Sequence, residues 1–170
     1  MQASDLAGLS HAQLLRFYRT MVASRRVDDR EQSLKRQNKA YFQISGAGHE
    51  AVGVAVGDPS DPHRAWFFPS YRDRPLMLAL VQSPLDHLLQ AVGAEDDPAS
   101  GGRQMPGHFG DARFNTPTSS SPTGTQFLQA VGAAEAGTKF AAIEGLIEDG
   151  DASFADDDVV VVWHGDGAPT

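Results

Sequence analysis

The chain has 170 residues, of which 41% are hydrophobic and 21% charged, so it is long enough to build one domain with a hydrophobic core. Its net charge of −8 repels phosphate and disfavours nucleic acid as a partner. The sequence has no cysteine, no secretory signal and no run of roughly 18 apolar residues, so we expect a soluble cytoplasmic protein that does not enter the membrane and has no disulfide or thiolate metal site.

The first predicted element is a long helix over residues 11–38. Ser10 and Gln13 form a capping-box pattern, and apolar residues then recur at helical spacing with arginines between them. Eight of the 14 Lys and Arg residues lie between Arg16 and Lys39, together with three acidic residues. The simplest interpretation of this charge is a solvated helix face with salt bridges along it.

Three shorter helices and one strand are predicted before residue 93. The stretch "AGHEAVGVAVG" (47–57) indicates a buried helix whose small side chains let another backbone approach closely. The stretch "AWFF" (65–68) predicts a short strand, and "SYRDRPLMLALVQ" after it turns helical. Ser83 and Pro84 then open another helix, with Asp86 in its first turn.

No periodicity is visible from Gly93 to Thr123. A loop of about thirty residues inside a compact domain is typical of a functional or a disordered segment. This one contains His108, Phe109 and Phe114, which are poor residues for a solvated linker. His108 could carry a proton in a reaction, but its residue type and position favour a packed loop histidine.

The remaining elements are a helix over about 126–143 and a strand at "DVVVVW" (158–163), separated by the acidic stretch "EDGDASFADDD". The spacing in the acidic stretch fits no calcium loop, so we expect an exposed surface loop. The run of β-branched residues predicts a strand covered on both faces, as in a parallel sheet. The sequence ends beyond the carboxyl end of this strand, where open α/β sheets bind their ligands.

Three short segments carry residue types that suit a ligand site. Asp166 in "GDG" could bind a magnesium ion on a diphosphate, although such triplets are also common in plain turns. Arg72 in "YRD" could bind phosphate through its forked guanidinium or form a structural ion pair. The stretch "SSSPTGTQ" (119–126) could cap a helix, hold an anion or coordinate an alkali cation through oxygen atoms.

Taken in order, five segments resemble the alpha subunit of the thiamine-diphosphate-dependent 2-oxoacid dehydrogenases. They are "MVASRRVDDREQSLKRQNKAYFQISGAGHEA", "FFPSYRD", "GRQMPGHFG", "SSSPTGTQ" followed by "AVGAA", and "VVVVWHGDGA". The resemblance covers nearly all of the chain from Leu14 onward, and "GRQMP" is similar to the branched-chain type, 3-methyl-2-oxobutanoate dehydrogenase. It implies the N-terminal part of a three-layer α/β thiamine-diphosphate-binding fold, with a parallel sheet and a long leading helix. Residues 1–44 would lead into an incomplete cofactor-binding domain at 45–170.

The resemblance also implies roles for particular residues. Arg72 would bind the diphosphate, and thiamine diphosphate would further contact Tyr71, Ser121, Thr123, Gly165, Gly167 and Ala168. Asp166 would bind Mg²⁺, and a K⁺ site would be formed by Ser120, Pro122, Thr125 and Gln126. The family's catalytic histidine and the asparagines that complete its magnesium motif would lie beyond Thr170, so the resemblance assigns no catalytic residue within the sequence.

The implied function is oxidative decarboxylation of branched-chain 2-oxoacids, with transfer of the acyl group to a lipoyl-bearing acyltransferase core. The chain would act in an α2β2 heterotetramer with a beta subunit, and we expect the 170-residue piece to be inactive alone. Two alternatives are a non-catalytic interaction fragment that docks on a partner and binds no cofactor, and a nucleotide-binding α/β domain. Only the glycines after a strand suggest the latter.

Overall fold

The computed structural model describes residues 8–57, 65–80, 82–143, 158–165 and 167–168. In chain order the elements are α1 (His11–Arg36), α2 (Glu50–Val56), β1 (Ala65–Phe68), α3 (Arg74–Ala79), α4 (Pro84–Ala91), the 3₁₀ helix η3 (Ala112–Phe114), α5 (Thr125–Ala142) and β2 (Val159–Val162). Of the helices that these residues form, none has the length and apolar character needed to cross a bilayer. The acidic stretch before β2 lies largely outside the described residues, and so does Asp166.

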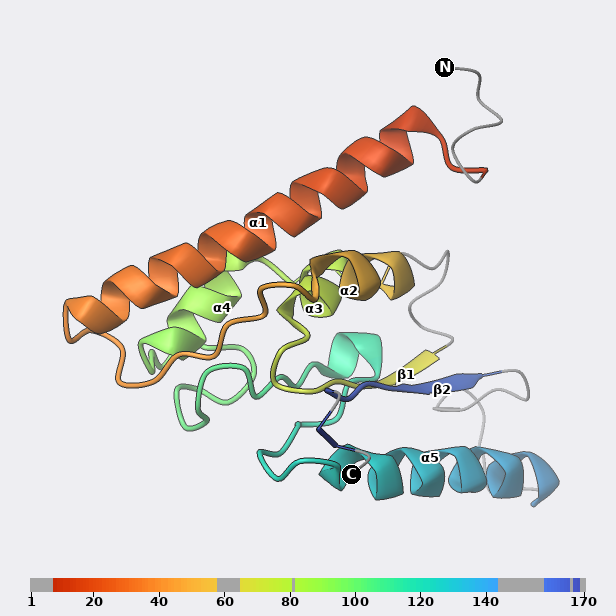
Figure 1. The fold of residues 1–170 in the computed structure, drawn as a ribbon. Coiled ribbons are helices and arrows are strands. Elements are labelled where there is room, and N and C mark those ends of the chain that lie inside the picture. Colours follow the sequence, from red (N-terminus) through yellow and green to blue (C-terminus); the bar gives the residue numbers. More distant parts are fainter. Residues whose placement is uncertain (1–7, 58–64, 81, 144–157, 166, 169–170) are drawn as a thin grey trace.

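The two strands pair in parallel, with Ala65 opposite Val159 and Phe68 opposite Val162. Parallel strands require a crossover connection, and α5 lies in the connection between β1 and β2 and packs against both strands. Figure 1 shows the sheet between α5 on one side and α2, α3 and η3 on the other, with α1 farther out on the latter side. The layered α/β architecture with a parallel sheet is therefore confirmed.

The hydrophobic core lies on the α3 side of the sheet. Strand side chains alternate between faces, so Phe67 of β1 and Val161 beside it on β2 point the same way. Phe67 packs there with Leu76, Met77 and Leu80 and with two residues of the long loop, Phe109 and Phe114. The aromatic residues of this loop thus close the core, which agrees with the prediction that the loop is no solvated linker.

Helix α1 begins with the predicted capping box. The Ser10 hydroxyl oxygen accepts from the Gln13 backbone nitrogen, and the Gln13 side-chain oxygen accepts from the Ser10 backbone nitrogen. The helix ends at Arg36, slightly before the predicted end at residue 38. Its first half leans away from α2 (Figure 1), and Leu15 and Tyr18 are exposed there. Its second half contacts α2, α3 and α4.

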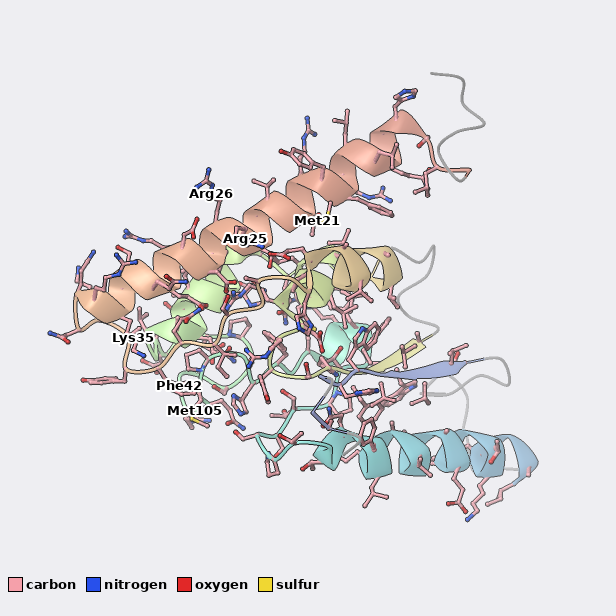
Figure 2. All side chains as sticks on the ribbon, viewed as in Figure 1. Met21, Arg25, Arg26, Lys35, Phe42 and Met105 are labelled. Atoms are coloured by element: carbon pink, nitrogen blue, oxygen red, sulfur yellow. The ribbon has the colours of Figure 1, made fainter. Side chains whose placement is uncertain are left out.

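The sequence predicted that the charges of α1 lie on a solvated face, and this is true of only some of them. Arg26 points away from the rest of the molecule (Figure 2), is 79% exposed and approaches Asp29 at 3.5 Å. Asp28 and Glu31, in contrast, are buried and both contact Arg74 of α3. Burial raises the pKa of Glu31 to about 7, against the opposing effect of Arg74. The charge pattern of α1 therefore includes a buried link between two helices.

Helix α2 is only partly buried, so the prediction of a buried helix is wrong for its outer side. Gly53 and Val54 are buried against α3, whereas the side chain of Val52 is 51% exposed. The predicted close approach of another backbone is confirmed, because a Cβ atom at Gly53 would lie 2.8 Å from the backbone nitrogen of Leu76. Glu50, at the start of α2, also pairs with Arg25 of α1 at 2.6 Å.

Strand β2 is less buried than its run of valines predicts. No residue of β2 is buried, and Val159 is 58% exposed. The physical reason is that, within the described residues, β2 has a hydrogen-bonded neighbour on one edge only, which is β1. Both faces of β2 are covered as predicted, by α5 and by the core, but in the described part of the sheet its side chains are only partly buried.

Candidate cofactor site

The carboxyl ends of β1 and β2 meet at one edge of the sheet, and a cleft of about 210 Å³ opens there. Three segments line it: residues 70–72 after β1, residues 120–126 at the start of α5, and the residues that follow β2. Among its lining residues are most of those that the sequence predicted for the site, namely Tyr71, Arg72, Ser120, Pro122, Thr123, Gln126, Gly165, Gly167 and Ala168. Parallel pairing brings these segments together from positions far apart in the sequence.

Of the other three predicted residues, two are described, and neither lines this cleft. Ser121 lines a second cleft next to the first. Thr125 is the first residue of α5, and its backbone nitrogen donates to the Pro122 carbonyl at 3.2 Å. Asp166 lies outside the described residues. The residues expected for a potassium site thus lie within residues 120–126, at the loop that leads into α5, whereas the residue expected to bind magnesium is outside the described residues.

Arg72 is held by contacts to uncharged groups. Its Nη1 donates to the Ser45 carbonyl at 3.0 Å, and its guanidinium carbon lies 5.1 Å from the centre of the Tyr71 ring. Among the described residues no carboxylate forms an ion pair with Arg72, in contrast to the structural ion pair that the sequence left open. Its positive charge therefore faces the cleft without a protein counter-ion in the described part of the chain.

The turn that carries Tyr71 and Arg72 is closed by Asp73. The Asp73 carboxylate accepts from the Ser70 backbone nitrogen at 2.7 Å, and the Asp73 backbone nitrogen donates to the Ser70 carbonyl at 3.2 Å. Asp73 is buried, and this burial raises the pKa of its carboxyl group, while the bonds from Ser70 act in the opposite direction. The two residues between Ser70 and Asp73 are thus fixed at the mouth of the cleft.

Helix α5 points its N-terminus at the same cleft. The helix is preceded by Gly124, whose φ of 83° is a left-handed conformation that favours glycine. No side chain caps this end, so the interpretation of "SSSPTGTQ" as a helix cap is wrong. The first backbone N–H groups of a helix lack partners within it, which makes an uncapped N-terminus suitable for an anion.

Gln126 connects α5 to the end of the sheet. Its side-chain nitrogen donates to the Trp163 carbonyl at 2.7 Å, and the Trp163 backbone nitrogen donates to the Phe68 carbonyl at 3.1 Å. These two bonds extend the pairing of β1 and β2 by one residue and attach the first turn of α5 to it. The three segments that line the cleft are therefore held at fixed positions relative to one another.

The second cleft, of about 450 Å³, shares Tyr71 and Arg72 with the first. Its other lining residues come from the segment after α1 and from the long loop: Phe42, Gln43, Ile44, Ser45, Met105, His108 and Ser121. Figure 2 shows Phe42 and Met105 close together at this side of the molecule. The sequence did not point to residues 42–45, for which the only signal was the two apolar residues Phe42 and Ile44 between two predicted helices.

His108 is buried against Ser121 at the base of the second cleft. Its Nδ1 lies 3.1 Å from the Met105 carbonyl and 3.3 Å from the Pro106 carbonyl, so Nδ1 carries the proton that these acceptors require. Nε2 is then the acceptor of a short hydrogen bond from the Ser121 hydroxyl. The prediction of a packed histidine is confirmed, but its contact with a predicted cofactor residue was missed.

The described lining of the first cleft suits a diphosphate. It offers the Arg72 guanidinium, the hydroxyl groups of Ser70, Ser120 and Thr123, and glycine backbone, and it contains no carboxylate among the described residues. Guanidinium groups, hydroxyls and exposed N–H groups all bind phosphate oxygens. The residues present therefore fit the phosphate end of thiamine diphosphate.

Comparison with known proteins agrees with this geometry. Residues 18–170 match the family described as "Dehydrogenase E1 component". The chain is 40% identical over 130 residues to "2-oxoisovalerate dehydrogenase subunit alpha" of Bacillus subtilis, which covers 76% of this chain and 39% of that protein. It is 31% identical over 166 residues to the protein of the same name from Pseudomonas aeruginosa, covering 94% of this chain and 35% of the relative.

A mitochondrial relative, "2-oxoisovalerate dehydrogenase subunit alpha, mitochondrial" of Mus musculus, is 34% identical over 130 residues, covering 75% of this chain and 28% of the relative. The aligned part of the chain thus corresponds to about two fifths or less of the length of these relatives. The family match covers most of the sequence and includes both segments that follow the strands at the cleft. The chain belongs to the dehydrogenase E1 component family.

Proposed function

We propose that the chain supplies the alpha-subunit part of the cofactor site in a branched-chain 2-oxoacid dehydrogenase. The complete enzyme would decarboxylate the 2-oxoacid oxidatively and transfer the acyl group to a lipoyl-bearing acyltransferase. The observation that carries this proposal is the cleft at the carboxyl ends of β1 and β2, where Arg72, the N-terminus of α5 and Gly165 converge. The family relationship supports the same assignment.

Thiamine diphosphate, when bound, supplies the carbon nucleophile and the electron sink for decarboxylation. The chain's own residues bind and orient it. Arg72 would contact the diphosphate oxygens, with the α5 N-terminus and the glycines after β2 nearby, while Ser121 and Thr123 would lie against the cofactor. Asp166 would bind Mg²⁺, and Ser120, Pro122, Thr125 and Gln126 would bind K⁺, which would stiffen this turn.

The lining of the second cleft supports a 2-oxoacid substrate with a branched alkyl chain. Phe42, Ile44 and Met105 provide apolar surface beside the cleft that would hold the diphosphate. Burial of a branched alkyl chain there would be favourable at about 25 cal/mol per Å² of apolar surface removed from water. The short side chain of pyruvate would use less of this surface, so the site would favour larger 2-oxoacids.

We further propose that a beta subunit completes the site in an α2β2 complex. The support is the relatives' description as alpha subunits and the open cleft at the sheet edge. The lipoyl-bearing acyltransferase would accept the acyl group from that complex. The division at residues 44 and 45 and the cytoplasmic location stay predictions from the sequence.

The test is reconstitution of the full-length alpha chain with its beta subunit, followed by measurement of CO₂ release with thiamine diphosphate and Mg²⁺. We expect a higher kcat/KM for 3-methyl-2-oxobutanoate than for pyruvate, and loss of activity in the Arg72→Ala variant. Preference for pyruvate would contradict the assignment of the second cleft. A complex that assembles but releases no CO₂ with any 2-oxoacid would favour the non-catalytic alternative.

A further inference from the structure

The carboxylate of Asp28 lies behind the proposed cofactor site, on the second half of α1. Its side chain is buried. Its Oδ2 accepts two hydrogen bonds from one short segment of chain, from the Ser45 hydroxyl at 2.8 Å and from the Gly46 backbone nitrogen at 3.1 Å. Asp28 therefore fixes residues 45 and 46 against α1.

The same two residues hold Arg72. The Ser45 carbonyl accepts from Nη1 of the Arg72 guanidinium at 3.0 Å. The Gly46 backbone lies so close to the Arg72 backbone that a Cβ atom at Gly46 would be 2.7 Å from the Arg72 carbonyl oxygen. One segment thus contacts both the charged end and the main chain of Arg72, which leaves the guanidinium little freedom to turn.

The other carboxylate oxygen of Asp28 pairs with the Arg74 guanidinium. Oδ1 of Asp28 contacts Nη1 of Arg74 in a buried ion pair, and Nη2 of the same guanidinium binds Glu31 at 2.7 Å. Both carboxylates therefore form ion pairs with Arg74, but among the described contacts only Asp28 also binds residues 45 and 46. Glu31 instead interacts with Gln43 of the second cleft, so among the described residues only Asp28 connects the ion cluster to the segment that holds Arg72.

We propose that Asp28 is a positioning residue for cofactor binding: through Ser45 and Gly46 it sets the direction of the Arg72 guanidinium at the diphosphate cleft. The proposal rests on the proposed function, because it needs Arg72 to bind the cofactor. An amide at position 28 has one acceptor oxygen in place of two. If that oxygen stays on Arg74, the amide nitrogen faces the Ser45 hydroxyl and the Gly46 nitrogen, and the segment loses its fixed position.

The experiment is a double-mutant cycle on the complex of the full-length alpha chain with its beta subunit. The dissociation constant of thiamine diphosphate is measured by calorimetry at fixed Mg²⁺ for Asp28→Asn, Arg72→Ala and the double variant. We expect Asp28→Asn to weaken binding about tenfold in the native background and by less than about twofold when Arg72 is already alanine. Equal weakening of binding in both backgrounds would indicate a structural effect unrelated to Arg72 and would overturn the proposal.

Two further variants separate positioning from folding. Ser45→Ala removes the bond to Asp28 and the exposed bond from the Ala47 backbone nitrogen, and it leaves Arg74 paired; we expect about threefold weaker binding with a nearly unchanged melting temperature. Glu31→Gln is the matched control at the same ion cluster and should change the affinity by less than about twofold. Unchanged affinity in both Asp28→Asn and Ser45→Ala overturns the positioning role while leaving Arg72 in the site. Unchanged affinity in Arg72→Ala overturns this role and the assignment of Arg72 together.

Discussion

Replacement of Arg74 by methionine would test the buried ion cluster that joins α1 to α3. The Arg74 side chain is 3% exposed, and its two terminal nitrogens contact Asp28 and Glu31, the latter at 2.7 Å. Methionine fills a similar volume but leaves two buried carboxylates without their cation. Removal of one partner from a buried ion pair costs about 3–5 kcal/mol, so we expect a loss of this size in the free energy of unfolding at pH 7.5.

The assay is urea unfolding with linear extrapolation to water, and Arg26→Met is the matched control on the same helix. Arg26 is 79% exposed in its pair with Asp29, so its replacement should change stability by less than about 1 kcal/mol. The loss in Arg74→Met should shrink at pH 5, because Glu31, with a pKa of about 7, is then protonated and no longer needs a cation. A loss below about 1 kcal/mol at pH 7.5, or one that does not depend on pH, would show that the pairing of Arg74 with the two acids does not stabilise the native state.

Three further predictions concern Glu31, the second cleft and the magnesium site. Burial raises the pKa of Glu31 from 4.5 to about 7, so between these pH values the native state holds a proton that the unfolded state has lost. The stabilisation from this proton is therefore fully present below pH 4.5 and is lost as the pH rises through 7. Glu31→Gln should remove that fall in urea-derived stability, and an identical pH profile would contradict the assignment. Met105→Trp should lower kcat/KM for 3-methyl-2-oxobutanoate more than for pyruvate in steady-state assays, whereas Leu15→Trp on the exposed part of α1 should affect neither. Asp166→Ala in the full-length chain should abolish the Mg²⁺ dependence of thiamine diphosphate binding in calorimetry while leaving the circular dichroism spectrum intact, and a retained dependence would remove Asp166 from the site.

The elements that the sequence predicted well are those whose signals are local. The capping box of Ser10 and Gln13 and the Ser83 and Pro84 start of α4 lie within a few residues, and both helices begin where these patterns place them. The meeting of the segments after β1 and β2 could also be anticipated, because the carboxyl ends of parallel strands share one edge.

The features that the sequence could not predict depend on contacts between distant residues. The charge pattern of α1 does not show that Glu31 turns inward, because its partner Arg74 lies 43 residues away. The bond between His108 and Ser121 likewise joins residues 13 positions apart in a loop without periodicity. The valines of β2 show the tendency to form a strand, but their burial depends on the neighbours that the sheet supplies.

We propose that the cleft at the carboxyl ends of β1 and β2 forms part of a thiamine diphosphate site. The most direct test is calorimetric titration of the assembled alpha and beta complex with thiamine diphosphate, in the presence and in the absence of Mg²⁺. We expect saturable binding that requires Mg²⁺ and is strongly weakened in the Arg72→Ala variant. Absence of binding by a correctly assembled complex, or the same affinity in wild type and Arg72→Ala, would contradict this proposal.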